Sequence, residues 1–173
     1  REICDRAVDA YRNMHHEFPA GWRQLDNILR RAWLEGNPMQ FGPGGVVKIT
    51  KGVVKGPTGL ELRYADVQYE YGPEELSYRY GRFTHKIYGA KFLENITQYL
   101  ARLVVMDAAL RLYRKGLRFI LQAHDELVFI VRQEHVDDSV RLIHAAMTQP
   151  PVWAPDLPLT ADVGVGGDYA AAK

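Results

Sequence analysis

The residues of this sequence best suited to chemistry are His124, Asp125 and Glu126, in the segment 122–128 (QAHDELV). The two adjacent carboxylates lie in the middle of an apolar stretch of β type, where a charge is costly to bury without compensation. Carboxylate oxygens are the ligands that hard divalent cations such as Mg²⁺ prefer. The segment therefore predicts a metal site suited to phosphoryl transfer, with His124 able to donate a hydrogen bond to an anionic substrate.

The apolar residues on both sides of these three predict a β-hairpin. As a single strand, the stretch from Leu117 to Val131 would span about 50 Å, which is too long for a small domain. A turn near His124 resolves this, and the two arms are then expected to be at least half buried. An ordinary polar turn, in which aspartate is common, accounts for the same residues and stays open as an alternative.

A long amphipathic helix is predicted from about Lys91 to Lys115, with Gly116 as its C-cap. Its polar residues recur at spacings of three and four and so share a second face: Lys91, Glu94, Asn95, Gln98 and Arg102. Amide side chains on such a face could contact the hydrogen-bond acceptors of the DNA minor groove, which are similar in all base pairs. A solvated helix face with internal pairing is the alternative interpretation.

The remaining elements are predicted from hydrophobic periodicity. Two helices precede Gly36, a glycine-punctuated hairpin region begins at Val46, and the segment 68–90 is basic and rich in tyrosine. A further helix runs from Glu134 to Met147, and the tail at 159–168 is predicted to form a last strand. This pattern indicates one compact α/β (α+β) unit, with antiparallel hairpins packed on long helices.

Composition limits the choice of protein class. The chain has 173 residues, of which 47% are hydrophobic, enough for one well-buried domain or a large piece of a bigger one. Because 22 basic residues balance 21 acidic ones, any surface for nucleic acid must be local. The single Cys4 excludes an intramolecular disulfide, and no apolar run reaches about 18 residues, so a soluble cytoplasmic protein without a membrane partner is expected. Arg1 in first place indicates a piece of a larger polypeptide.

Several segments, in the same order along the chain, resemble segments of family A (pol I-like) DNA polymerases of the phage type. Residues 122–128 resemble the family's motif C, a His-Asp-Glu turn between two palm strands. Residues 91–102 (KFLENITQYLAR) resemble the helix beneath the minor groove of the primer–template duplex. Residues 56–64 (GPTGLELRY) resemble a loop with a Pro-Ser-Gly-Arg pattern, and residues 157–166 resemble the terminal palm strand.

The resemblance implies a nucleotidyltransferase that adds deoxynucleotides to a primer 3′ end with two Mg²⁺ ions. It assigns Asp125 and Glu126 as the catalytic carboxylates that bind metal. The DNA-binding residues that it implies are His124, Gln122, Asn95, Gln98, Lys91 and Arg102. The implied partners are primer–template DNA and dNTP.

The resemblance also implies the C-terminal palm portion of a right-hand polymerase. Residues 1–67 would be a helical and hairpin segment following the fingers helix, and residues 68–173 a palm segment with the motif C hairpin and a C-terminal strand. The family's motif A aspartate and fingers helix have no counterpart in the sequence, so a separate N-terminal chain is expected to supply them. Two alternatives stay open: a duplex-binding half without catalysis, and an HD-type metal phosphohydrolase built on the His124–Asp125 doublet.

Overall fold

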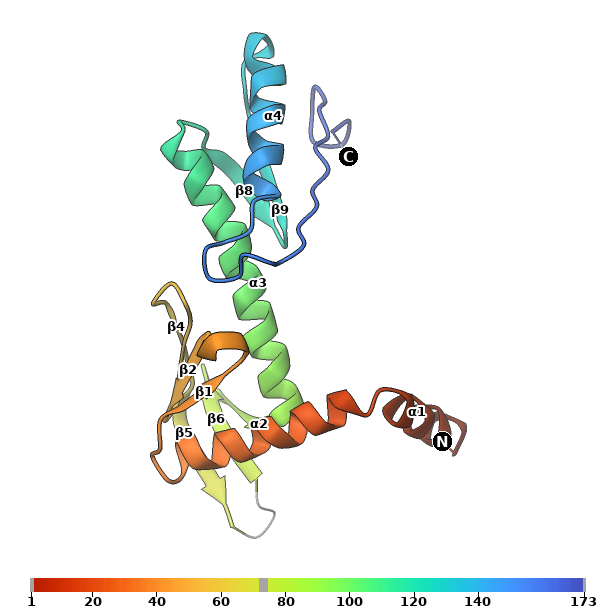
Figure 1. Cartoon of the computed structure of the whole chain (residues 1–173), viewed down its shortest axis with the longest axis vertical. Coiled ribbons are helices and arrows are strands. Elements are labelled where there is room, and N and C mark those ends of the chain that lie inside the picture. The colour runs from red at the N-terminus through yellow and green to blue at the C-terminus, as the bar shows by residue number, and fades with distance from the viewer. Residues whose placement is uncertain (1, 72–74, 173) are drawn as a thin grey trace. The chain divides into compact units, whose positions relative to one another are not determined.

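The computed structural model of the chain describes residues 2–71 and 75–172. These residues belong to two compact units, Arg1–Tyr99 and Leu100–Lys173, and helix α3 (Gly89–Arg114) contributes to both (Figure 1). Both units combine helices with antiparallel strands, so the α+β fold class predicted from the sequence is confirmed. The predicted boundary between residues 67 and 68 stays a prediction.

The first unit contains two further helices and two antiparallel sheets. The helices are α1 (Glu2–Met14) and α2 (Glu17–Trp33), with a short 3₁₀ turn at Pro43–Gly45. One sheet has the order β1 (Met39–Phe41), β2 (Val47–Thr50), β3 (Val53–Lys55) and β4 (Glu61–Arg63), and the other has the order β5 (Ala65–Glu70), β6 (Glu75–Tyr80) and β7 (Phe83–Ile87).

Helix α2 begins at Glu17, two residues before Pro19. Pro19 does not prevent this, because it lies in the first helical turn, where a missing N–H costs no intrahelical hydrogen bond. The helix contacts β1 and β2 and buries one face against them.

Aromatic rings dominate the core of the first unit. Trp33 of α2 lies with its ring centroid 5.0 Å from that of Tyr64 and 5.7 Å from that of Phe92 on α3. Aliphatic residues that are fully buried complete this core: Leu25, Leu29, Val47, Ile49 and Val54. The start of α3 is thereby packed into the first unit, which fixes the direction in which its polar side chains leave the helix.

The second unit holds the rest of α3 and the predicted hairpin. Its other elements are β8 (Phe119–Ala123), β9 (Glu126–Phe129), a 3₁₀ turn (Gln133–His135) and α4 (Val136–Met147). The Gly116 cap is confirmed: Gly116 has a φ of +89°, its N–H donates to the Tyr113 carbonyl, and the Leu117 N–H donates to the Leu112 carbonyl. Arg111 joins α3 to the end of α4 by donating to the carbonyl oxygens of Ala146 and Gln149, both at 2.8 Å.

Three features of the second unit differ from expectation. Helical spacing predicts that Leu110 shares a buried stripe with Phe92, Ile96, Leu100, Leu103 and Met106. In the structure Leu110 is 51% exposed and Leu112 is fully buried, so the buried face of α3 turns away from that stripe. The hairpin arms are more open than predicted, with Ile120 61% and Ile130 76% exposed. Residues 148–172 contain no strand: the described tail pairs with neither edge of the two-stranded sheet of this unit, and a strand needs such a partner.

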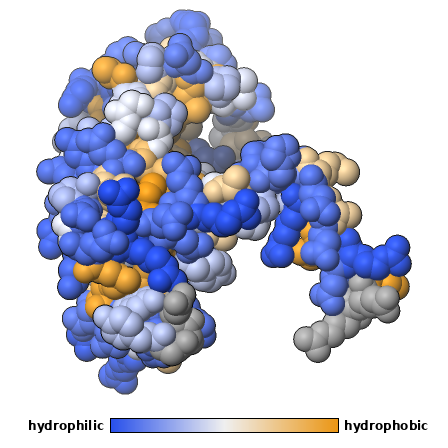
Figure 2. Space-filling view, turned by 60° about the horizontal axis from the view of Figure 1, so that its bottom comes forward, coloured by the Kyte–Doolittle hydropathy of each residue, from blue (hydrophilic) through white to orange (hydrophobic). Residues whose placement is uncertain are grey.

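On the face shown in Figure 2, hydrophilic residues predominate and hydrophobic ones form separate patches. Over residues 2–71 and 75–172, no helix combines the length and the apolar composition that crossing a membrane requires.

Candidate active site and nucleic-acid interface

The hairpin of the second unit turns at His124 and Asp125. Ala123 pairs with Glu126 across the turn, so only two residues connect β8 to β9. Ile120 has no partner in the register between Phe119 and Leu121, which marks a β-bulge. The predicted hairpin is confirmed, and its turn presents His124 and Asp125 as exposed side chains.

His124 adopts a backbone conformation that favours glycine. Its φ is +53°, whereas Asp125 is not among the residues with positive φ. In two-residue hairpins, positive φ at the first turn residue alone is the pattern of a type II′ turn, which usually places glycine there. A side chain at such a position costs about 1 kcal/mol or more, and strain of this kind clusters at functional sites.

Neighbouring side chains contact the turn and Glu126, the residue that follows it. Gln122 donates from Nε2 to the His124 carbonyl oxygen at 3.3 Å, so it supports the turn from the strand before it. Tyr169, in the C-terminal segment, donates from its hydroxyl to Oε2 of Glu126 at 3.0 Å. Asp125 makes no hydrogen bond or ion pair with any residue that the structure describes, and its carboxylate faces solvent.

The two carboxylates do not complete a metal site by themselves. Within the described ranges, no group of three or more His, Cys, Asp or Glu side chains comes together in a way that could hold a metal ion. Asp125 and Glu126 nevertheless provide the hard oxygen donors that Mg²⁺ prefers, and Asp125 is free to turn toward a cation. The arrangement fits part of a magnesium site.

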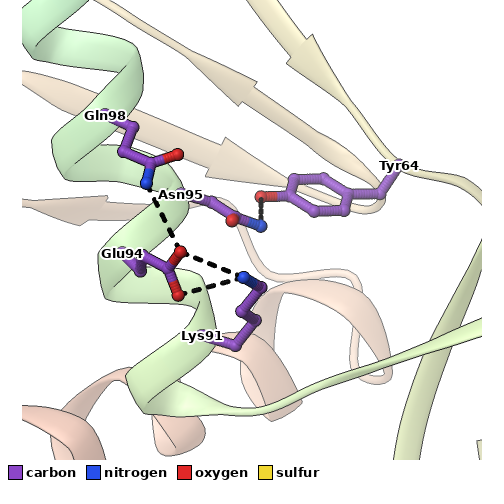
Figure 3. Close-up of polar contacts among 5 residues, drawn as sticks. All are labelled: Tyr64, Lys91, Glu94, Asn95 and Gln98. Carbon is purple, nitrogen blue, oxygen red and sulfur yellow. Dashed lines mark hydrogen bonds and ion pairs between the residues drawn. The ribbon is translucent and has the colours of Figure 1, made fainter.

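The polar face of α3 presents a second set of predicted residues, which belongs to the first unit (Figure 3). The Glu94 carboxylate accepts hydrogen bonds from Lys91 Nζ at 3.0 and 3.1 Å and from Gln98 Nε2 at 3.4 Å. The hydrogen bond to Glu94 raises the pKa of Lys91, so this ammonium group stays charged. Lys91 and Gln98 are thus connected through Glu94 and face solvent. The alternative interpretation, a solvated helix face with internal pairing, predicts the same contacts.

Asn95 points elsewhere. Its Nδ2 donates to the Tyr64 hydroxyl oxygen at 3.1 Å, and Figure 3 shows this amide directed away from the Glu94 group. Tyr64 is only 5% exposed, and burial raises its pKa to about 12, against the opposite effect of the Asn95 hydrogen bond. Arg102 is exposed further along α3, in the second unit. The hairpin residues also belong to the second unit, whereas Lys91, Asn95 and Gln98 belong to the first.

A contact that the sequence did not reveal joins α3 to the 56–60 loop. The Tyr99 hydroxyl donates to the Leu60 carbonyl at 2.7 Å and accepts from the Gly56 N–H at 3.1 Å. A Cβ at Gly56 would lie 2.3 Å from that hydroxyl oxygen, which explains the glycine. The signal available in the sequence was a tyrosine at the border between the polar and apolar stripes of the helix.

Sequence comparisons connect these features to known proteins. A DNA polymerase of Bacillus phage SP02 is 30% identical over 175 aligned residues, which cover 94% of this chain and 26% of the phage protein. Thermostable DNA polymerase I of Thermus aquaticus is 35% identical over 74 residues, and that of Thermus filiformis is 32% identical over 74 residues. These two alignments cover 43% of this chain and 9% of each relative.

No family model and no solved structure matches the chain. The chain spans about a quarter of the length of the phage relative, since 26% of that protein is covered. The resemblance to family A DNA polymerases is confirmed by these relatives: the chain is related to a part of a phage-type, pol I-like DNA polymerase.

Proposed function

We propose that this chain is the C-terminal palm part of a DNA-directed DNA polymerase. In the reaction, the 3′ oxygen of a primer attacks the α-phosphate of a dNTP, and pyrophosphate leaves. The observation that carries the proposal is the placement of Asp125 in a two-residue hairpin turn with Glu126 at the start of the next strand, in a chain related to DNA polymerases. A separate N-terminal chain would supply motif A and the fingers.

The metal chemistry requires a carboxylate from outside these residues. Asp125 and Glu126 would hold Mg²⁺ together with the motif A aspartate of the partner chain. Bound Mg²⁺ ions would stabilise the charge that develops on the attacking and leaving oxygens. Within the chain, the hydrogen bond from the Tyr169 hydroxyl would hold the Glu126 carboxylate in position.

The turn would meet the end of the primer. His124 projects from its position of positive φ, and Gln122 holds the His124 carbonyl, so the imidazole is presented in a restricted direction. From there it would donate a hydrogen bond to the primer terminus. The cost of the backbone conformation is then offset by a contact that a relaxed turn would not make.

The polar face of α3 would contact the duplex. Lys91 and Gln98 are solvent-facing and can reach sugar, phosphate or minor-groove acceptors, which are alike in all base pairs. Asn95 would reach DNA only by leaving Tyr64, so in this structure its amide serves the packing of the helix. Arg102 would add a positive charge to the same helix.

The test is extension of a primer by the chain assembled with its N-terminal partner in Mg²⁺. Asp125→Ala is expected to lower the extension rate by about 10²–10³-fold or more, because a charge-stabilising group acting on the reacting oxygens is lost. Primer–template affinity should change little. Asp156→Ala is the matched control, since Asp156 is an exposed aspartate of the same unit outside the hairpin.

Two outcomes would decide against the proposal. Near-normal extension by Asp125→Ala would remove this residue from catalysis. An assembled wild-type protein that binds primer–template but never extends it would instead identify a duplex-binding half without catalysis.

A further inference from the structure

The β6–β7 hairpin of the first unit carries aromatic side chains beyond the point where its core packing ends. On one face, Leu76 pairs with Ile87, and both are buried at 7% and 3% exposure. The same face continues outward with Tyr78 opposite His85 and then Tyr80 opposite Phe83. Core packing does not explain the outer pair, because Tyr80 is 75% and Phe83 is 71% exposed.

Four rings share this face and are here called the aromatic platform: Tyr78 is half-buried, and Tyr80, Phe83 and His85 are exposed. The His85 ring lies 5.7 Å from the Tyr78 ring, with an angle of 30° between the planes, and 6.3 Å from the Tyr80 ring. Tyr78 in turn contacts the buried Tyr64, with ring centroids 4.9 Å apart. The platform is therefore anchored to the core at one end and open at the other.

Charge around the platform favours an anionic partner. The described β6–β7 residues, 75–87, contain three basic side chains, Arg79, Arg82 and Lys86, and one acidic side chain, Glu75. Arg79 pairs with Asp66 and Lys86 pairs with Glu75, both from strand positions that alternate with the platform residues. Arg82 lies in the Gly81–Arg82 turn at the tip, beside the outer rings, and makes no ion pair with any residue that the structure describes.

We propose that the aromatic platform stacks against unpaired bases of a nucleic-acid strand, with Arg82 contacting a neighbouring phosphate. Every base has a π-face, and stacking on protein rings is worth about 1–3 kcal/mol per base. In a duplex both faces of each base are covered by neighbouring pairs, so exposed rings select strands whose bases are unpaired. The identity of that strand as polymerase template rests on the proposed function, whereas the binding chemistry does not.

Binding by the 173-residue chain tests this directly. The probe is a fluorescein-labelled oligothymidylate, and the comparison is a duplex of equal length, both followed by anisotropy at low salt. The single strand is expected to bind more tightly. Tyr80→Leu and Phe83→Leu should each weaken that binding by about fivefold or more, and Tyr80→Phe should restore it, because a phenyl ring can stack.

Two further variants separate stacking from charge and from general loss of a tyrosine. Arg82→Gln should reduce the salt dependence of binding by a slope of about 0.7, the value for one phosphate contact to a single strand. Tyr71→Leu is the matched control, since Tyr71 is 87% exposed but follows β5 at the other end of the sheet. It should leave oligonucleotide binding unchanged.

Unchanged oligonucleotide binding in Tyr80→Leu and Phe83→Leu would overturn the proposal. A loss of self-association in these variants, without a change in oligonucleotide binding, would identify the platform as a protein interface and overturn it as well. No extension step enters the measurement, so a negative result leaves the polymerase proposal standing. Conversely, an inactive assembled enzyme would not affect the single-strand binding expected here.

Discussion

The Tyr99 hydroxyl donates a hydrogen bond to the carbonyl oxygen of Leu60 at 2.7 Å, across 39 positions of the sequence. The same oxygen accepts from the Gly56 N–H, so one side chain of α3 closes both ends of the 56–60 loop. The 56–60 loop is thus attached to the helix that carries Lys91 and Gln98.

Tyr99→Phe removes this attachment and keeps the ring. We expect the free energy of unfolding to fall by about 0.5–1.5 kcal/mol, the usual net value of one hydrogen bond. Urea denaturation measures it, with Tyr71→Phe as the control because Tyr71 is 87% exposed. Equal effects of the two substitutions would show that the Tyr99 hydroxyl does not hold the loop.

Tyr64 makes stability depend on pH in the alkaline range. Burial raises its pKa from 10.0 to about 12, so between these values the folded state holds a proton that the unfolded state has lost. The contribution of protonated Tyr64 to the free energy of unfolding is therefore complete below pH 10 and is lost as the pH rises toward 12. At pH 11 the loss amounts to about 1.4 kcal/mol.

The comparison of wild type with Tyr64→Phe isolates this effect. We expect the variant to be less stable at pH 8, since Asn95 loses its partner, but to lose less additional stability between pH 9 and pH 11. Denaturant titrations at the three pH values provide the measurement. Parallel pH profiles for the two proteins would contradict the assignment.

His124 can be tested through its backbone. Glycine normally destabilises a strand or helix relative to alanine, but at a φ of +53° it removes a steric conflict. His124→Gly is therefore expected to be more stable than His124→Ala by about 1 kcal/mol, as measured in urea. In the assembled polymerase both variants should extend a primer poorly, because both lack the imidazole. A more stable alanine variant would be inconsistent with the left-handed turn.

Asp26 of α2 stabilises the beginning of α3. Its Oδ1 accepts the Gly89 N–H, and a negative charge is favourable at a helix N-terminus. Asp26→Ala should cost about 1–2 kcal/mol of stability, and Asp26→Asn less, because an amide oxygen still accepts. Asp9→Ala on the exposed helix α1 is the control, and the prediction fails if the two alanine variants lose equal stability.

A substitution of Gly89 provides a second test of the contact between α2 and the start of α3. A Cβ at this position would lie 1.9 Å from the Trp22 carbonyl oxygen, so Gly89→Ala is expected to destabilise more than Asp26→Ala.

Local patterns predicted the long helix, its glycine cap and the hairpin that turns at His124. Each depends on residues close in sequence: the apolar stripe of α3, the positive φ of Gly116, and the polar turn between two apolar arms. The helix pattern overestimated how long one face stays buried, because the second unit packs against Leu112 and not Leu110.

Contacts between distant residues could not be predicted in this way. Asn95 had the residue type and spacing of a DNA contact, yet its amide is bound to Tyr64, 31 positions earlier. The terminal strand was expected from its composition, but pairing with a sheet edge depends on contacts with distant residues, and the described tail pairs with neither β8 nor β9. Resemblance to a family supplied the roles proposed for Asp125 and Glu126, which residue spacing alone left open between a metal site and an ordinary turn.

The two-stranded sheet of the second unit has a consequence for handling the chain in solution. Within the described residues, neither outer edge of β8 or β9 pairs with another strand, and the bulge at Ile120 interrupts only one of them. Unpaired edges flanked by exposed isoleucines are templates for intermolecular β-pairing. The isolated chain is therefore expected to aggregate with rising concentration, and a lysine in place of Ile130 should delay turbidity without altering the turn.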